Sequence, residues 1–597
     1  LSGGGTTIIN GASTVQAEGC SSFDPPLVLD NFRRLELNAP LAITGGCISP
    51  ESGATFVVGA EGTVDFQAGD TGIRPIDASS SLPTLINNGT IVKTAGAGTF
   101  ESSTIGYQNS FNIGDERLIL QNNGTIRAET GTIRIYYSES STNSDGLLEM
   151  TDGNFTLYRA EDGASTAVDV GGTIQGPGRV RLNGELALSG TIDLSGTLSM
   201  RDGQALTEAL TINQLNTLRV RTNKFTDAVF AFNAAGAQTV QTLSVQGRME
   251  LNTDLTIANR FTFGTGEPST LTGSGNLTVP AGATMEWGDG RMGGGGTLTV
   301  GGTLTSVVAQ YLDGDFPTQS SQATLNGRHL VVSGSVVWDD APLYLNAGAT
   351  VDVQSGGTFD LQRDGRIEPG DGSTSEEQVI NAGTLVKSGV GQRIDSENPF
   401  PGPGDGDATT YDTVSYGMPI AVPVTNSGTL SLEAGRTAFT DALDNTGRIQ
   451  GTDTLDVSTV GAFTNTGTLA PGTSPGTLTV EGPVDLSGTT LAIEALGATP
   501  GTGHDQLKAT GAVQLGGTLD VTLLDGYDPP GGTSFTLVEA ESVAGTFDAV
   551  NRPTLSGRTV DVEYQAGSVT LTVTADNTPP TASDDEAQTT EGTAVII

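Results

Sequence analysis

The chain has 597 residues and a formal net charge of −41, from 68 acidic and 27 basic side chains. A field of that sign repels phosphate backbones and anionic lipid surfaces, so nucleic-acid binding is not expected. With 84 glycines, 26 prolines and only 5% aromatic residues, the core must come from short aliphatic runs, none of which approaches the ~20 apolar residues of a membrane span.

Near the N-terminus lie Cys20 and Cys47, the only two cysteines in the sequence. In a chain otherwise free of thiols, a disulfide between them is expected. It would imply an oxidising, extracytoplasmic location. The alternative interpretation is two small buried residues.

A short phrase recurs along the chain: Asn, any residue, Gly, then Thr or Arg, then Ile or Leu. It begins at Asn87, Asn122, Asn381, Asn426, Asn445 and Asn465. Asn88-Gly-Thr and Asn123-Gly-Thr are formal glycosylation sequons. The copies at Asn381 and Asn445 contain no sequon, so the phrase is interpreted as a backbone turn that leads into a strand.

The spacing of these turns predicts the fold class. The phrase at Asn445 recurs after 20 residues, and four- to six-residue runs of β-formers lie between Gly, Asn or Asp throughout. This pattern predicts an all-β, parallel β-helix or β-solenoid, whose coils stack ~4.8 Å apart. Gly and Asn are expected in left-handed corners, with the Asn side chains hydrogen-bonded from coil to coil. Residues 204–215 are the one candidate helix.

A longer repeat overlies the coils, because Gly53-Ala-Thr matches Gly348-Ala-Thr at an offset of 295 residues. Residues 1–295 are therefore predicted to form a first solenoid block and residues 296–490 a second. Longer alternating strands in 491–575 predict a β-rich C-terminal cap, which covers the last open coil. Residues 576–597 read as an acidic linker followed by the first strand of a further repeat.

Segments such as "MEWGDGRMGGGGTLTV" (Met285–Val300) and "NAGATVDVQSGGTFDLQ" (Asn346–Gln362) resemble the Gly/Thr-rich repeats of secreted bacterial proteins. Autotransporter passengers and filamentous-haemagglutinin-like adhesins have such repeats. The resemblance covers most of residues 30–575 and implies a right-handed parallel β-helix on or outside a bacterial cell.

The tail "DNTPPTASDDEAQTTEGTAV" resembles the start of a bacterial cadherin-like tandem repeat. The resemblance implies calcium binding by Asp576, Asp584, Asp585 and Glu586. The alternative is a solvated linker without metal. No other cofactor is expected.

Carboxylates beside tryptophan form the second candidate site. Trp287 lies beside Asp289 and Glu286, and Trp338 lies beside Asp339 and Asp340. An indole ring can stack on a sugar while the acids hold its hydroxyl groups, and it can equally fill a wide corner of the solenoid. Cleavage of a polysaccharide would need two carboxyl groups about 5–10 Å apart across coils.

These patterns favour an extracellular bacterial solenoid with a structural or adhesive role, either a rod or the subunit of a self-assembling filament, and not an enzyme. Its expected partners are a further copy, joined head to tail through the C-terminal strand, or a surface glycan. The alternative function is a β-helix protein that binds or cleaves polysaccharide.

Overall fold

The computed structural model describes residues 1, 4–16, 27–30, 32–75, 81–96, 102–106, 117–159, 168–201, 205–221, 229–265, 268–307, 312–313, 316–317, 322–339, 342–362, 365–389, 418–460, 463–473 and 475–576. Every regular element in these residues is a β-strand. The candidate helix at 204–215 is wrong, because its described part lies in strand β22 (Ala205–Arg221). A helix with the length and apolar character needed to cross a membrane is absent from these ranges.

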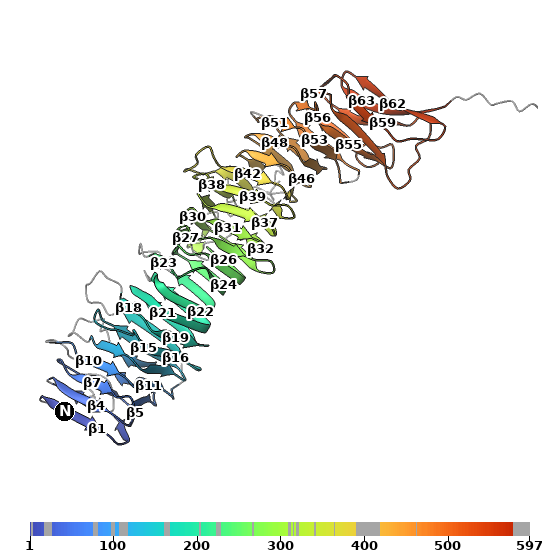
Figure 1. Cartoon of the computed structure of the whole chain (residues 1–597). Coiled ribbons are helices and arrows are strands. Elements are labelled where there is room, and N and C mark those ends of the chain that lie inside the picture. The colour runs from blue at the N-terminus through green and yellow to red at the C-terminus, as the bar shows by residue number, and fades with distance from the viewer. Residues whose placement is uncertain are drawn as a thin grey trace, which may run out of the picture. The chain divides into compact units, whose positions relative to one another are not determined.

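Each coil contributes strands that pair in parallel with the equivalent strands of the neighbouring coils (Figure 1). One coil consists of β30 (Gly290–Gly293), β31 (Thr297–Val300) and β32 (Thr303–Ser306). These strands pair in parallel with β35 (Ala323–Asn326), β36 (His329–Val332) and β37 (Ser335–Asp339), respectively. The fold is therefore the predicted parallel β-solenoid, with inward-facing aliphatic side chains that are almost all fully buried.

The chain divides into two compact units, Leu1–Asp444 with Thr459–Phe463, and Asn445–Ser458 with Thr464–Ile597. In the first unit, parallel pairing continues across residue 295, because β28 (Leu277–Val279) pairs with β31. In the second unit, β55 (Thr490–Ala495), β58 (Thr518–Leu523) and β61 (Ala549–Asn551) stack in parallel. Antiparallel pairing joins β63 (Ser568–Ala575) to β59 (Ser534–Glu539) and to β62 (Arg558–Gln565). The segment predicted as a cap thus contains further parallel coils as well as an antiparallel sheet.

The recurring asparagines form ladders of buried amides, as predicted. Asn87 donates from Nδ2 to Oδ1 of Asn122 at 2.7 Å, and Asn122 donates in the same way to Asn143 at 2.6 Å. Asn87 and Asn122 are 0% exposed. The same contact recurs at 2.6 Å between Asn381 and Asn426 and at 2.7 Å between Asn445 and Asn465. Each ladder satisfies polar groups that would otherwise be costly to bury.

The prediction of a left-handed backbone at these turns is wrong. Among the described residues with positive φ are neither the asparagines nor the glycines of the recurring phrase. Glycine is required there for space instead, since a Cβ on Gly89 would lie 2.2 Å from the carbonyl oxygen of Gly59 and 2.3 Å from that of Gly62. A Cβ on Gly124 would in turn lie 2.2 Å from the carbonyl oxygen of Gly89. Stacked turns therefore approach more closely than any side chain allows.

The 295-residue repeat is visible in the backbone. Gly53 and Gly348 have φ values of 75° and 73°, each preceded by a residue that also has positive φ. Lys93 and Lys387, which occupy equivalent positions 294 residues apart, are both buried, at 0% and 3% exposure. The two copies therefore share their turn conformation and an unusual buried cation.

Arg328 ties together the turns of successive coils. Its guanidinium is fully buried and donates to four carbonyl oxygens at 2.9–3.1 Å, those of Gly273, Gly275, Gly293 and Thr297. Within the described ranges it has no carboxylate partner, and burial lowers its pKa to about 10. The positive charge is stabilised by carbonyl dipoles alone.

Candidate anion-binding face

The tryptophans predicted to contact sugar are core residues. Trp287 and Trp338 are both 0% exposed, and their rings meet edge to face with centroids 5.6 Å apart. Phe263 and Phe359 extend this aromatic row at 6.1 and 6.3 Å. With both faces of each indole covered, stacking on a sugar is not available here. The alternative interpretation, that tryptophan fills a wide part of the solenoid, is the one that agrees with the structure.

The described acids beside these tryptophans belong to residues that contact neighbouring coils, as in the ion pair of Glu286 with Arg260. Asp289 is half-buried and accepts the backbone N–H of Gln322 at 3.3 Å. Burial raises its pKa, partly offset by backbone N–H groups. Asp339 is tied through its backbone N–H to the hydroxyl of Ser306 at 2.6 Å, and Asp340 lies outside the described residues.

The other predicted sites fall largely on residues that the structure does not describe. Cys47 is 1% exposed and disulfide-bonded, but Cys20 lies outside the described residues, and the pairing of the two stays a prediction. Of the four expected calcium ligands only Asp576 is described, and its backbone N–H donates to Gly557 at 3.0 Å. Asp584, Asp585 and Glu586 lie beyond it, so calcium at the tail stays a prediction.

A different site emerges on one sheet of the first unit. Its strands are β15 (Thr132–Tyr137), β17 (Asn154–Arg159), β20 (Arg179–Asn183) and the C-terminal ends of β21 (Leu186–Arg201) and β22. Apart from Arg159 at the end of β17, the inward-facing residues of these strands are aliphatic or aromatic and buried. Because side chains alternate across a strand, the intervening residues face solvent. Six exposed arginines lie there, one of which is Arg201 at the end of β21. We call the other five the arginine face: Arg134, Arg179, Arg181, Arg219 and Arg221.

Parallel pairing aligns the central positions of this face into a regular column. Arginine and a hydroxyl residue alternate from coil to coil in it, in the order Arg134, Thr156, Arg181, Ser199, Arg219 and Ser244. With ~4.8 Å between paired strands, the three arginines are ~10 Å apart along the column. We call these six positions the central column.

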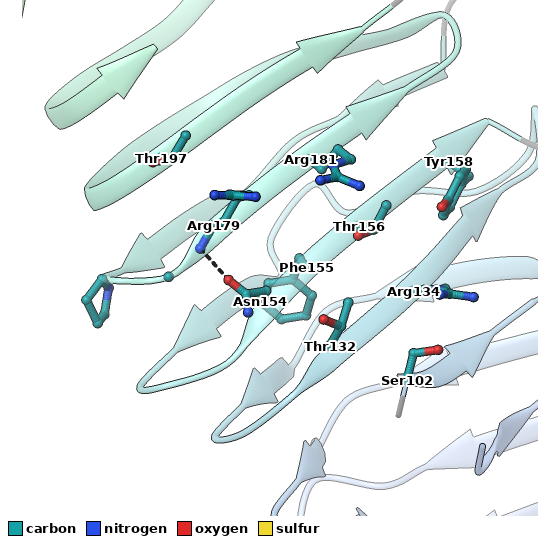
Figure 2. Close-up of a pocket in the computed structure, with 12 residues that line it drawn as sticks. Ser102, Thr132, Arg134, Asn154, Phe155, Thr156, Tyr158, Arg179, Arg181 and Thr197 are labelled. Carbon is teal, nitrogen blue, oxygen red and sulfur yellow. Dashed lines mark hydrogen bonds between the residues drawn. The ribbon is translucent and has the colours of Figure 1, made fainter. Parts of the chain in front are cut away.

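The face is hollowed. A groove of about 650 Å³ is lined by Arg134, Arg179 and Arg181, and an adjoining one of about 410 Å³ is lined by Arg179, Arg181, Arg219 and Arg221 among others. Figure 2 shows Arg179 and Arg181 on one strand and Arg134 on another, with Thr156 between them.

Two further contacts shape the groove. The Oδ1 atom of Asn154 accepts the backbone N–H of Arg179 at 2.9 Å, the contact that is dashed in Figure 2. Beside the central column, Tyr136 and Tyr158 stack with centroids 4.5 Å apart and an interplanar angle of 7°. The tyrosines form a side wall along the direction in which the coils stack.

Electrostatics distinguishes this face from the rest of the chain. Several arginines elsewhere form ion pairs, for example Arg127 with Glu149 at 2.6 Å and Arg260 with Glu286 at 2.9 Å. None of the five arginines of the face makes an ion pair with a described residue, and β15, β17 and β20 contain no acidic residue. Because guanidinium does not lose its proton near neutral pH, the face carries uncompensated positive charge on a chain of net charge −41.

A smaller cavity of about 330 Å³ lies in the second unit, lined by Glu494, Asp505 and Asp520 among others. Asp505 is 2% exposed and accepts the backbone N–H groups of Gly476 at 2.7 Å and Glu494 at 2.8 Å. Burial raises its pKa to about 6, with Glu494 adding to the rise. No set of three or more His, Cys, Asp or Glu side chains placed to hold a metal ion occurs among the described residues. This carboxylate holds the backbone of strand β55 next to that of Gly476.

Neither a protein-family model nor a curated protein sequence matches this chain. The ligand of the arginine face must therefore be inferred from the chemistry of the face itself.

Proposed function

We propose that this chain is an extracellular bacterial solenoid with a structural and adhesive role, and that the arginine face is its attachment surface for an acidic polysaccharide. The observation that carries the proposal is the gathering of five exposed arginines without ion pairs on a chain of net charge −41. A cluster of like charges is destabilising unless an anion compensates it, so the cluster points to an anionic ligand.

The ligand class follows from charge density. A nucleic-acid duplex carries one charge per ~1.7 Å, and the acidic remainder of the chain repels such a polymer strongly. A polysaccharide with widely spaced carboxylates is repelled less and still meets the local positive field. Guanidinium groups bind carboxylates through paired, planar hydrogen bonds, which suits this chemistry.

The location is supported by the disulfide-bonded state of Cys47, because structural disulfides persist in oxidising compartments. The adhesive role is supported by the architecture, since stacked parallel coils present the same backbone geometry over many successive strands. A ligand that spans several coils meets its side chains at regular steps.

The test compares two matched double variants. Arg181→Ser with Arg219→Ser removes two charges from the face, and Arg34→Ser with Arg291→Ser removes two charges from strands outside the face, β4 (Arg33–Leu37) and β30. Binding to a soluble polymer of alternating glucuronate and N-acetylglucosamine is measured by calorimetry at two salt concentrations.

At ~1 kcal/mol for each exposed charge-assisted contact, the face variant is expected to bind about 30-fold more weakly. Its affinity should also depend less on salt. The control variant should bind as the native chain does. Equal weakening in both variants would show that only net charge matters and would remove the arginine face from the function.

A further inference from the structure

The central column alternates strictly between charge and hydroxyl over six coils, from Arg134 through Thr156, Arg181, Ser199 and Arg219 to Ser244. Repulsion between paired strands disfavours arginine on adjacent coils, but it does not require an arginine on every second coil. The positions are also 18 to 25 residues apart in the sequence, and only the coil register brings them into line.

We infer that the ligand is a linear polysaccharide with a carboxylate on every second sugar, which lies along the direction of coil stacking with one sugar for each coil. This inference rests on the proposed function and specifies its ligand. A sugar ring in an extended chain has about the length of one ~4.8 Å coil step. A carboxylate on alternate rings then meets Arg134, Arg181 and Arg219 in turn.

The hydroxyl residues between the arginines complete the match. Thr156, Ser199 and Ser244 lie opposite the neutral rings, where a hydroxyl group can both donate to and accept from a sugar hydroxyl or amide. Of the three, Thr156 is buried and the other two are half-buried, so they form the floor between the projecting arginines. A polymer with a carboxylate on every ring would place alternate charges over these hydroxyls, where the central column itself holds no cation and only Ser199 has an arginine, Arg201, two residues away on its strand.

The row of residues beside the central column makes the two ends of the groove chemically different. The stacked rings of Tyr136 and Tyr158 lie on one side of the first two coils, and pairing aligns Tyr158 with Asn183 in the next coil. Arg221 belongs to the same flanking row, because Asn183 pairs with Arg201 and Arg201 pairs with Arg221. The wall is thus uncharged at one end of the groove and cationic at the other, so the two directions of a polar polysaccharide chain are not equivalent.

The experiment shifts the spacing of charge without changing its amount. Arg219→Ser combined with Ser244→Arg moves the last arginine of the central column by one coil and leaves the net charge unchanged. Arg219→Ser alone serves as the reference. Each variant is titrated with two soluble polymers of equal length, one that alternates glucuronate with N-acetylglucosamine and one of galacturonate only. Circular dichroism and urea melts confirm that each variant is folded.

For the alternating polymer, the shifted variant should lose about as much affinity as Arg219→Ser alone, roughly 5- to 10-fold. For the galacturonate polymer, which has a charge at every step, the shifted variant should bind as the native chain does. If the shifted variant keeps native affinity for the alternating polymer, the spacing inference is overturned while the attachment function stands. If the native chain binds only the galacturonate polymer, the inference fails in the same way. If it binds neither polymer, the proposed function fails as well.

Discussion

Replacing Gly89 by alanine tests how the turns of the solenoid stack. A Cβ there would lie 2.2 and 2.3 Å from two backbone carbonyl oxygens of the preceding coil, whereas real contacts of this kind exceed ~3 Å. The stacked turns would have to separate by close to 1 Å. The hydrogen bonds from the N–H of Asn88 to Val58 at 2.8 Å and from the N–H of Thr90 to Gly62 at 3.0 Å cross this gap and would stretch.

The expected loss of folding free energy has two parts. Overpacking contributes ~1–3 kcal/mol, and two weakened backbone hydrogen bonds contribute ~1 kcal/mol each. We therefore expect Gly89→Ala to destabilise the surrounding coils by ~3–5 kcal/mol. Two other glycines distinguish the energetic cost of a steric clash from that of a positive φ. A Cβ on Gly282 would meet no atom within 4 Å, but its φ is +85°, so Gly282→Ala should cost ~1–2 kcal/mol. Gly295 has the same open space with an ordinary φ, and its replacement by alanine should be almost neutral.

Hydrogen exchange detected by mass spectrometry is the appropriate assay, because a repeat structure can open locally without complete unfolding. Peptides that contain β10 (Thr84–Asn87) and β13 (Ile119–Asn122) should lose protection in Gly89→Ala and keep it in the other two variants. The reasoning would be refuted if Gly89→Ala exchanged no faster than Gly295→Ala, because the close approach of stacked turns would then carry no energetic weight.

Three further outcomes are expected. Asn122→Leu leaves a donor on Asn87 and an acceptor on Asn143 without partners in a buried ladder. It should lower the free energy of unfolding by ~2–5 kcal/mol in urea melts. A neutral result would mean that the ladder is not stabilising. Arg328→Met leaves four buried carbonyl groups without their donor and should lower the melting temperature markedly, whereas Arg328→Lys, with fewer donors, should recover only part of the loss; full recovery would mean that charge alone is needed. The raised pKa of Asp505, about 6, favours its protonated form in the fold, so this residue contributes stability at low pH that is lost as pH rises from about 4 to about 6. Relative to Asp505→Asn, the native chain should lose roughly 3 kcal/mol across that range in urea melts, and a pH-independent difference would contradict the assignment.

The fold was predictable because its signals are local. Short β runs between Gly and Asn define the strands, and the Asn-x-Gly phrase marks a turn whose amides could be expected to stack. The reason for glycine at that turn was not predictable, because the close approach to Gly59 and Gly62 depends on how a coil seats on its neighbour. From the local sequence alone, a left-handed backbone was the only reason that could be proposed for glycine at this turn, and that reason is wrong.

The candidate site was not predictable either, because it depends on which residues the register between coils brings side by side. The Trp-acid pairs looked functional in sequence, but the alternation within the strand directs Trp287 and Trp338 inward. The arginine face, in contrast, joins residues from three strands that are far apart in the sequence, and the large net negative charge conceals a local excess of the opposite sign. The one available signal was the pair of "RVR" segments, Arg179–Arg181 and Arg219–Arg221, which place two arginines on the same side of a strand.

The most direct test of the central claim is chemical footprinting of arginine. The folded chain is treated with phenylglyoxal, with and without the alternating acidic polysaccharide, and the modified residues are quantified by mass spectrometry. The ligand is expected to protect Arg134, Arg179, Arg181, Arg219 and Arg221 several-fold and to leave the modification of Arg34 and Arg291 unchanged. Protection that is spread evenly over all exposed arginines, or absent from the arginine face, would contradict it.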